Sequence, residues 1–353
     1  MRIIQILNTF SYGDAIGNHA LTIHRELIKR NIDSKIYARV IDARVREYAD
    51  LYENYIEQKD DTILYHLSSG NDLNKEILKH RCKIGLNYHN ITPGEFFEEY
   101  CPDIQKNCNL GREDLKRFKD KVDFVIGVSD FNIQEIKELD FNCKLYTIPI
   151  LINFNDYNQT SDSEVLKNLS DGKENILFVG RIAPNKCQEK LISDFYFYKK
   201  IYNPNSRLIL VGNPDGIENY YLRLKRYVSK LKLQDVIFTG HLKFAEILSY
   251  YKKASLFVCE SAHEGFCVPL VEAMYFNVPI IARDCGAIKE TLGDGGIILK
   301  NYSPIETASV MNKLMNDEIV QNLMKENQNK RIEKFKTKYI MEQYLEALGC
   351  NGN

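Results

Sequence analysis

Two series of short apolar segments, each alternating with longer helical stretches, constrain the fold of this chain more than any other feature. Strands and helices that alternate in this way are typical of a doubly wound parallel sheet with helices on both faces. The stretch between the two series is rich in Asn, Asp and Ser, as linkers are. The expected strands are residues 2–7, 35–39, 62–66, 84–88, 124–128 and 145–149 in the first series, and 175–179, 207–211, 236–238, 255–258, 279–282 and 296–299 in the second.

The length of the chain agrees with two such domains. A chain of 353 residues is too long for one small core, and it fits two α/β domains. We expect the first domain at 1–155, a linker at 156–174 and the second domain at 175–335. The segment 336–353 contains a last helical stretch, expected from Lys336 to Leu348 because its apolar residues recur at helical spacing.

Composition indicates a globular protein, with 44% hydrophobic and 27% charged residues. A formal net charge of -1 gives no electrostatic reason to expect a nucleic-acid partner. Nine cysteines, an odd count without a C-x-x-C pair, indicate free thiols in a reducing cytoplasm. No apolar run approaches the roughly 20 residues that cross a bilayer, and the first residues turn polar too soon for a signal peptide, so a cytoplasmic protein is expected.

Glu264 and Glu272 stand with seven residues between them, around a glycine turn that leads into an apolar helix. The segment 254–258 is typical of a buried strand, and the helix is expected from Pro269 to Phe276 with the proline in its first turn. A strand, a turn and a helix N-terminus present backbone N–H groups and about half a positive charge, which suits a phosphate or diphosphate. Glu272 would then accept hydrogen bonds from ribose hydroxyls, and Glu264 would face the group beyond the phosphates. The alternative is a pair of surface charges that the helix dipole favours.

Two cations, Arg181 and Lys186, follow the apolar strand that ends at Gly180. Ligands of open α/β sheets bind beyond the carboxyl ends of the strands, where a guanidinium fork and a mobile ammonium suit phosphate oxygens. A phosphate loop of the Walker type is a competing interpretation. It fails because Asn185 stands where the second glycine is needed and Cys187 where a Ser or Thr is needed. Taken alone, Arg181 and Lys186 would more often be solvated loop charges than ligands.

The first domain offers two weaker candidates. Gly13 and Gly17 follow the first strand, before a helix expected from about Asn18 to Lys29, and they permit tight backbone approach. Their spacing is not that of the G-x-G-x-x-G dinucleotide fingerprint. His89 follows the strand at 84–86, at the end of the sheet where the other candidates are expected. An ordinary loop and a packed histidine are the alternatives for these two features.

Together these residues resemble glycosyltransferase family 4, whose members are retaining enzymes with the GT-B fold. The resemblance covers nearly the whole chain and is strongest in the E-x7-E element from Glu264 to Glu272. GDAIGN at 13–18 together with YHNITP at 88–93 is similar to a subgroup of bacterial O-antigen and capsule mannosyl- and rhamnosyltransferases. The other matching motifs are GRIAPNK at 180–186, RLILVGNPDG at 207–216, VIFTGHL at 236–242 and GAIKETLGDGG at 286–296.

The resemblance implies an α/β protein of two Rossmann-like doubly wound parallel-sheet domains that face a central cleft. The domain at 1–155 would bind the acceptor, the domain at 175–335 would bind a nucleotide sugar, and the helix in 336–353 would cross back to the N-terminal domain. The implied reaction moves a hexose or deoxyhexose, of the mannose or rhamnose type, from a GDP- or UDP-linked donor to a hydroxyl of a glycan or lipid-linked glycan. The anomeric configuration would be retained, and the product would serve bacterial cell-surface polysaccharide synthesis.

The same resemblance assigns roles to individual residues. Glu264 and His89 would be catalytic, in contact with the donor sugar and the incoming hydroxyl. Backbone groups near His241 and Leu242 would contact the base, and Glu272 would bind the ribose. The donor-binding set is Gly17, Arg181, Lys186, His241, Leu242, Gly265, Phe266, Val268 and Glu272.

No cofactor and no metal are expected, because the cations could stabilise the departing diphosphate and the sequence has no D-x-D pair. A zinc site built from His263 with Cys259, Cys267 and Cys285 is the alternative, but its ligand spacings do not fit. Basic and apolar residues alternate at 110–122, as in helices of the family that touch anionic lipid. A peripheral contact with the inner face of the plasma membrane therefore stays open beside a solvated helix.

Three other classes of protein remain as alternatives. A nucleotide-sugar 2-epimerase has the same two-domain architecture but needs no acceptor. A nicotinamide dehydrogenase is disfavoured by the glycine spacing after the first strand. A non-catalytic binder of nucleotide sugars would show affinity without turnover.

Overall fold

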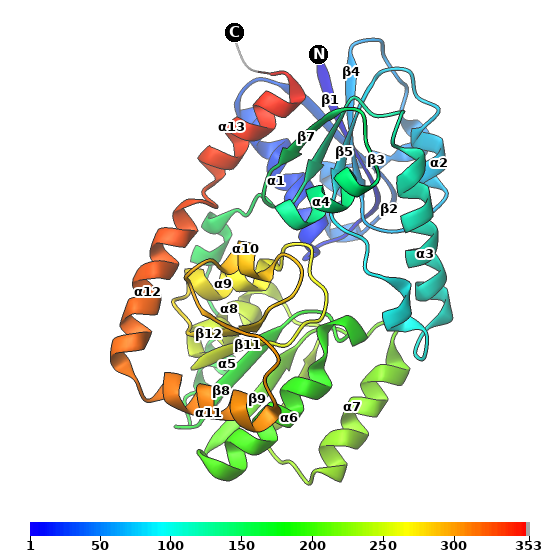
Figure 1. The fold of residues 1–353 in the computed structure, drawn as a ribbon. Coiled ribbons are helices and arrows are strands. Elements are labelled where there is room, and N and C mark those ends of the chain that lie inside the picture. The colour runs from blue at the N-terminus through cyan, green and yellow to red at the C-terminus, as the bar shows by residue number, and fades with distance from the viewer. Residues whose placement is uncertain (351–353) are drawn as a thin grey trace. The chain divides into compact units, whose positions relative to one another are not determined.

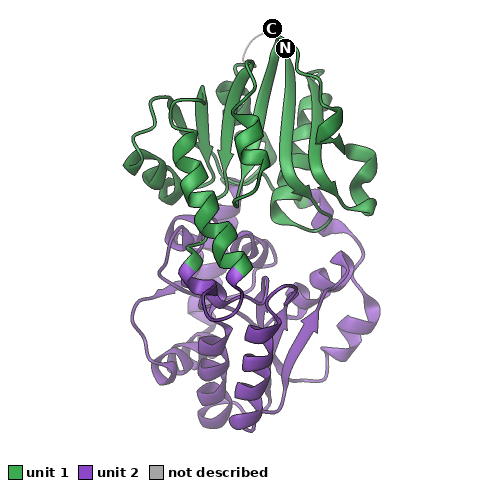
Figure 2. Ribbon diagram, turned by 90° about the vertical axis from the view of Figure 1, so that its right-hand side faces the viewer, with its two compact units in different colours: residues 1–94, 103–154, 334–353 green, residues 95–102, 155–333 purple. Residues whose placement is uncertain are grey.

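The computed structural model describes residues 1–350, which form two compact units (Figure 2). Unit 1 is built from residues 1–94, 103–154 and the described part of 334–353. Unit 2 is built from residues 95–102 and 155–333. Each unit has its own sheet and its own core, so each is described by itself.

The core of unit 1 is a parallel sheet covered by helices (Figure 1). Its first strand, β1 (Arg2–Phe10), lies between β2 and β4, and its inner residues Ile3, Ile4 and Ile6 have no exposed surface. Continuous burial of this kind is typical of a strand with helices on both faces. Across the described residues the order is β3-β2-β1-β4-β5-β6-β7, with β2 Asp33–Ile41, β3 Asp50–Leu51, β4 Asp61–Leu67, β5 Lys83–Tyr88, β6 Phe124–Gly127 and β7 Lys144–Thr147.

Helix α1 of unit 1 begins earlier than the sequence predicted. It spans Ala15–Lys29 rather than starting near Asn18, because the Asp14 carboxylate accepts hydrogen bonds from the N–H groups of Ile16 and Gly17. Such an N-cap satisfies amides that a helix leaves without internal partners. The other helices of this unit are α2 (Leu73–Ile77), α3 (Pro102–Arg117), α4 (Asp130–Glu138) and α13 (Thr337–Leu348).

The last helix, α13, packs within unit 1 and begins one residue later than predicted. Tyr344 is fully buried, and its hydroxyl lies 2.8 Å from Nε2 of His19 and accepts a hydrogen bond of 3.1 Å from the Asn87 amide. These bonds join α13 to α1 and β5. Residues 351–353, the end of the predicted segment 336–353, lie outside the described residues.

Unit 2 repeats the same plan with a second parallel sheet. The switch in strand order falls between β8 and β11, because β9 and β10 extend the sheet on one side and β12 and β13 on the other. Within the described part of the chain the order is β10-β9-β8-β11-β12-β13, with β8 Glu174–Val179, β9 Ser206–Val211, β10 Val236–Gly240, β11 Leu256–Cys259, β12 Ile280–Arg283 and β13 Ile297–Leu299.

Most helices of unit 2 connect these strands, whereas α5 precedes β8 and both α11 and α12 follow β13 (Figure 1). α9 is the next element after β11 and carries Pro269 in its first turn, as the sequence predicted. Among the described residues, no helix combines the length and the apolar character that a membrane crossing requires. The helices are α5 (Ser163–Asn168), α6 (Gln188–Ile201), α7 (Glu218–Lys230), α8 (Phe244–Lys253), α9 (Val268–Tyr275), α10 (Ile288–Leu292), α11 (Pro304–Met315) and α12 (Glu318–Glu333).

The organisation differs from the expected one in several details, among them Asn155, which belongs to unit 2, and residues 334–335, which belong to unit 1. Residues 156–174 belong to unit 2 rather than to a separate linker, because the backbone N–H of Asp162 donates to the Ala245 carbonyl and the Ser249 hydroxyl donates to the Asp162 carbonyl. Residues 95–102 also belong to unit 2, although they lie inside the expected first domain. The two-residue strand β3 was not predicted, because an exposed edge strand of that length has no apolar pattern.

Candidate functional site

Glu264 lies in the loop between β11 and α9, and its backbone is fixed from two sides. Its carbonyl accepts a hydrogen bond of 3.0 Å from the Ala287 amide. Gly286 adopts φ +47°, and a Cβ on it would lie 2.3 Å from the same carbonyl oxygen. Cys267 ends the loop in a left-handed conformation with φ 73°, from which α9 starts. A glycine is therefore needed at 286 for the chain to hold Glu264 in place.

Lys186 lies in the loop that follows β8, at the end of the 3-10 turn η5 (Pro184–Lys186). The carbonyl of the buried Asn185 accepts a hydrogen bond of 2.8 Å from the Ala262 amide. This bond ties the loop after β8 to the loop after β11. The two loops are thus joined by their backbones as well as by the side chains of Lys186 and Glu264.

The ammonium of Lys186 lies 2.6 Å from Oε1 of Glu264, and the two side chains are only 22% and 8% exposed. Burial lowers the pKa of Lys186, but its acidic neighbours, with the Glu264 carboxylate first among them, together outweigh burial, and the pKa is raised. The lysine is therefore charged at neutral pH. The pair lies beyond the carboxyl ends of β8 and β11, at the switch point of the sheet, which is where open α/β sheets bind their ligands.

Arg181 is exposed and lies at the same edge of the sheet, directly after β8 and Gly180. Its guanidinium donates a hydrogen bond of 2.9 Å to the carbonyl of Asp215, in the loop after β9. The ends of these two strands come so close that a Cβ on Gly212 would lie 1.9 Å from the Gly180 carbonyl oxygen. Gly180 and Gly212 thus allow the two backbones to approach closely at the place where Arg181 begins the loop.

Glu272 lies on α9, one turn inside the helix, as the sequence predicted. Its two carboxylate oxygens accept hydrogen bonds from the hydroxyls of Tyr157, at 3.1 Å, and Tyr251, at 2.6 Å. Burial raises the pKa of Glu272, and the two tyrosine hydroxyls offset part of that rise. Each oxygen has a second lone pair, so the carboxylate can accept a further hydrogen bond. Its predicted contact with a ribose stays a prediction.

Three further predicted residues stand at the start of α9. Val268 is the first residue of the helix, and Gly265 and Phe266 precede it in the loop. Phe266 is buried, and its carbonyl accepts a hydrogen bond of 2.5 Å from the Thr291 hydroxyl. This hydrogen bond fixes the turn that precedes the first backbone amides of α9.

His241 and Leu242 follow β10 at the same edge of the sheet. His241 is exposed, and Gly240 before it adopts φ 69° and forms an antiparallel bridge with Gly212. Because β10 is two strands from β8, these residues lie farther from the switch point than Lys186 does. The structure thus brings all predicted residues of unit 2 to one edge of its sheet.

Unit 1 carries the other two predicted residues, Gly17 and His89. Gly17 lies in the first turn of α1, where a Cβ would lie 2.6 Å from the Ser11 carbonyl oxygen. His89 follows β5, and its Nε2 lies 2.9 Å from Nδ1 of His66. Both lie beyond the carboxyl ends of parallel strands of this sheet, where the sequence placed them.

The hydrogen-bond partners of His89 and Glu272 were not predicted from the sequence. His66 lies at the carboxyl end of the predicted strand 62–66, so the rule that selected His89 could also have selected it. Tyr157 and Tyr251 had no comparable signal. They lie 115 and 21 residues from Glu272 along the chain, and only the fold brings them to it.

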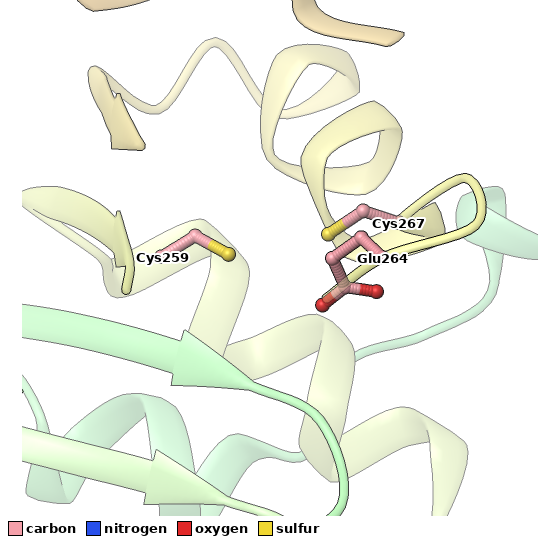
Figure 3. A group of neighbouring side chains, drawn as sticks. All are labelled: Cys259, Glu264 and Cys267. Carbon is pink, nitrogen blue, oxygen red and sulfur yellow. The ribbon is translucent and has the colours of Figure 1, made fainter. Parts of the chain in front are cut away.

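Cys259, Glu264 and Cys267 form a buried group whose ligand atoms all lie within 4.8 Å of one another (Figure 3). The Cys267 thiol donates to Cys259, which lowers the pKa of Cys259 and raises that of Cys267. The Lys186 ammonium already neutralises Glu264 in this group. The sequence expectation that the protein holds no metal stays a prediction.

Comparison with known proteins gives independent information. Residues 161–331 match the family described as "Glycosyl transferases group 1". An uncharacterized glycosyltransferase of Methanocaldococcus jannaschii is 30% identical over 236 residues, which are 66% of this chain and 61% of that protein. The O-antigen chain mannosyltransferase RfbU of Salmonella typhimurium is 34% identical over 143 residues, 40% of this chain and 38% of that protein. The matches thus span less than two thirds of these relatives.

Solved structures are similar over nearly the whole chain. Sucrose-phosphate synthase from Thermosynechococcus elongatus has a TM-score of 0.77 at 15% identity, covering 100% of both chains. Anabaena HepE, solved in complex with UDP and glucose, has a TM-score of 0.78 at 17% identity, covering 99% of this chain and 100% of that one. At such identities the likeness shows the fold alone. It confirms the predicted fold class, GT-B with two doubly wound parallel sheets.

Proposed function

We propose that this chain, whose residues 161–331 match the family of group 1 glycosyl transferases, transfers a sugar from a nucleotide diphosphate to a hydroxyl group. The observation that carries the proposal is the pair of Lys186 and Glu264 at the switch point of unit 2, joined at 2.6 Å. A charged lysine next to a carboxylate at this place suits a ligand with a diphosphate and a sugar.

The chemical difficulty of such a transfer is charge that develops in the transition state. Positive charge grows at the anomeric carbon, and negative charge grows on the departing diphosphate. Preorganised cations and amides aimed at that negative charge are the largest single source of catalysis in many enzymes. We assign this role to Lys186, Arg181 and the backbone at the start of α9, where Gly265, Phe266 and Val268 stand.

The remaining residues would position the donor. Glu264 would hold sugar hydroxyls and stabilise the positive charge, while Glu272 would accept hydrogen bonds from the ribose. Backbone groups of His241 and Leu242 would contact the base. On unit 1, we assign Gly17 to close backbone approach to the diphosphate and His89 to a sugar hydroxyl.

The names of the relatives support a more specific proposal for the donor and the acceptor. RfbU is named as an O-antigen chain mannosyltransferase, and a relative from Mycolicibacterium smegmatis, 33% identical over 124 residues, is named as a GDP-mannose-dependent alpha-mannosyltransferase. We therefore propose a mannose- or rhamnose-type donor linked to GDP, with UDP-linked hexose second. The acceptor is a glycan or lipid-linked glycan of cell-surface polysaccharide synthesis, the configuration is retained, and the enzyme works in the cytoplasm or at the inner face of the membrane.

A thermal-shift series with GDP, UDP, GDP-mannose and UDP-glucose tests donor binding, because a ligand that binds only the folded state raises the unfolding midpoint. The expected result is a rise with one nucleotide series in the natural protein and a smaller rise in Lys186→Ala. Lys190→Ala, which removes an exposed cation nearby, is the matched control. If no nucleotide raises the midpoint, the proposal is wrong.

Turnover separates the proposal from its alternatives. The donor that binds is incubated with and without a lipid-linked glycan, and the products are analysed by mass spectrometry and NMR. Transfer to the glycan with an unchanged anomeric configuration supports the proposal. An isomerised donor without acceptor would indicate a 2-epimerase, and binding without any product would indicate a non-catalytic binder.

A further inference from the structure

Three histidines of unit 1, His19, His66 and His89, lie next to one another. Their ring centroids are 5.2 to 5.9 Å apart. Burial lowers the pKa of His19 to about 3 and lowers the pKa of the other two well below the ordinary value. All three rings are therefore neutral near pH 7, and each has one N–H and one lone pair to place.

Gln5 decides which nitrogen of His66 carries the proton. The amide nitrogen of this fully buried glutamine donates a hydrogen bond of 2.9 Å to the Ala20 carbonyl, which can only accept. Its oxygen must then face Nε2 of His66, at 3.1 Å. Because that oxygen also can only accept, the His66 proton is on Nε2 and the lone pair is on Nδ1.

His66 in turn decides the tautomer of His89. Nδ1 of His66 lies 2.9 Å from Nε2 of His89, so the latter nitrogen must carry a proton and donate it. In the neutral ring the lone pair is then on Nδ1 of His89. That atom is buried, and it has no hydrogen-bond partner within residues 1–350.

His19 differs from His89 in the partners of its ring nitrogens. Nδ1 of His19 accepts a hydrogen bond of 2.8 Å from the Leu151 amide, and its Nε2 lies 2.8 Å from the Tyr344 hydroxyl. Both ring nitrogens of His19 are thus used by the protein. The lone pair on Nδ1 of His89, in contrast, has no partner among the described residues and is therefore available to a ligand.

We propose that Gln5 and His66 are positioning residues, which fix His89 in the tautomer whose Nδ1 accepts a hydrogen bond from a hydroxyl of the donor sugar or of the acceptor. The inference rests on the proposed function, which supplies the hydroxyl. A carbonyl, a glutamine and two imidazoles form one chain of hydrogen bonds, each with its direction set by the one before. The other tautomer of His89 would present an N–H, which could only donate to the hydroxyl oxygen and could not accept the proton of the hydroxyl.

The tautomers can be measured without any substrate. Long-range ¹H–¹⁵N correlation spectra of the full chain distinguish a protonated from an unprotonated ring nitrogen, and loss of signals in single variants assigns the seven histidines. The expected result is an unprotonated Nδ1 on both His66 and His89. A proton on Nδ1 of His89 would overturn the inference.

Two variants of equal shape test the role of His66. Asn at this position keeps an oxygen close to the place of Nδ1, whereas Leu has the same branching but accepts no hydrogen bond. His66→Asn should leave His89 in one tautomer, and His66→Leu should give a mixture. If His89 keeps its single tautomer in His66→Leu, His66 does not position it and the inference is wrong. His24→Leu, on α1 outside the cluster, is the control, and unfolding midpoints confirm that all three variants fold.

Kinetics then connect the tautomer to the reaction. His66→Leu should lose about a factor of ten in kcat, the size of one hydrogen bond, and His66→Asn should recover most of it. Calorimetric titration with the nucleotide sugar distinguishes the two hydroxyls. A weaker donor affinity in His66→Leu indicates the donor sugar, and an unchanged affinity indicates the acceptor. Equal kcat in the two variants would contradict the inference.

Failure of the inference and failure of the proposed function give different results. If no sugar is transferred but the tautomers are as stated, the reaction is wrong and the positioning of His89 stands. If sugar is transferred but Nδ1 of His89 carries a proton, the reaction stands and the positioning is wrong.

Discussion

The side chains of Lys186 and Glu264 meet at 2.6 Å although they are 78 positions apart in the chain. β8 and β11 are neighbours in the sheet, and a hydrogen bond from the Ala262 amide to the Asn185 carbonyl joins the loops that follow them, so the two residues face each other there. Without a ligand, each charge is satisfied by the other. A bound diphosphate would attract the ammonium and leave Glu264 to accept hydrogen bonds from sugar hydroxyls.

The first prediction concerns the separate roles of Lys186 and Glu264. Glu264→Gln and Lys186→Ala should each lower kcat by about 10² to 10³, as loss of one preorganised group that stabilises transition-state charge does. Lys186→Ala should also lower the free energy of unfolding by about 1 to 3 kcal/mol, because it leaves the buried Glu264 carboxylate without its cation. Initial rates of sugar transfer and denaturant unfolding measure the two effects.

The double variant gives the control for this prediction. Combining Lys186→Ala with Glu264→Gln removes both charges, so the loss of stability should be smaller than the sum of the two single losses. Activity should not return. Additive stability losses would show that the two side chains do not interact, and full activity of either single variant would refute the assignment of the site.

A second prediction concerns Gly286. Gly286→Ala should distort the Glu264 loop, because the added Cβ would lie 2.3 Å from the Glu264 carbonyl oxygen and the residue has φ +47°. Gly172→Ala is a matched control with φ +86° and no atom within 4 Å of the added Cβ. The control should lose only about 1 to 2 kcal/mol of stability from its backbone conformation. Gly286→Ala should lose more than the control and should also lose sugar transfer, and equal effects on both would argue against the contact.

The sequence predicted the backbone of this site better than its side-chain contacts. Continuous apolar runs such as 176–179 predicted the strands, and the position of Arg181, Lys186 and Glu264 after them predicted a shared edge of the sheet. Those inferences depend only on local pattern and on the rule that parallel strands present their carboxyl ends together. The fold class is confirmed by the two sheets.

Local sequence patterns could not predict the contacts between segments that are distant in the chain. The hydroxyls of Tyr157 and Tyr251 on Glu272 depend on where a turn of the expected linker and helix α8 pack, which no periodicity encodes. The early start of α1 at Ala15 follows from the Asp14 cap, a signal that the sequence did contain. The bond between Tyr344 and His19 joins residues 325 apart.

A pH dependence follows from Glu272. Burial raises the pKa of Glu272 above its ordinary value of 4.5, with the tyrosine hydroxyls offsetting part of the rise. The folded protein then binds the proton more tightly than the unfolded chain does, so stability falls as pH rises from about 4.5 through the folded pKa. Glu272→Gln does not titrate. Its unfolding midpoint should therefore rise relative to that of the natural protein between pH 4.5 and 7.

Tyr251→Phe extends this test. The variant lacks the hydroxyl that donates to Glu272 at 2.6 Å, so the pKa of Glu272 should rise further and the fall in stability should continue to a higher pH. A difference between Glu272→Gln and the natural protein that stays constant across this pH range would show that Glu272 does not titrate there.

The source of the positive charge at the diphosphate gives a fourth prediction. Lys186 and Arg181 supply two cations at the edge of the sheet where the diphosphate is proposed to bind, so sugar transfer should persist in excess chelator. Initial rates with EDTA and with added Mg²⁺ measure this. Loss of transfer in EDTA with recovery in Mg²⁺ would contradict the assignment of leaving-group stabilisation to the side chains.

The C-terminal helix gives the last prediction. The Tyr344 hydroxyl is fully buried, lies 2.8 Å from Nε2 of His19 and accepts a hydrogen bond from the Asn87 amide. Nδ1 of His19 accepts from the Leu151 amide, so its proton is on Nε2 and points to this hydroxyl. Tyr344→Phe would leave two buried donors without an acceptor and should lower the free energy of unfolding by about 1 to 3 kcal/mol. Tyr339→Phe, on the same helix but 48% exposed, should change it by less than about 0.5 kcal/mol, and equal losses in the two variants would show that these hydrogen bonds do not stabilise α13.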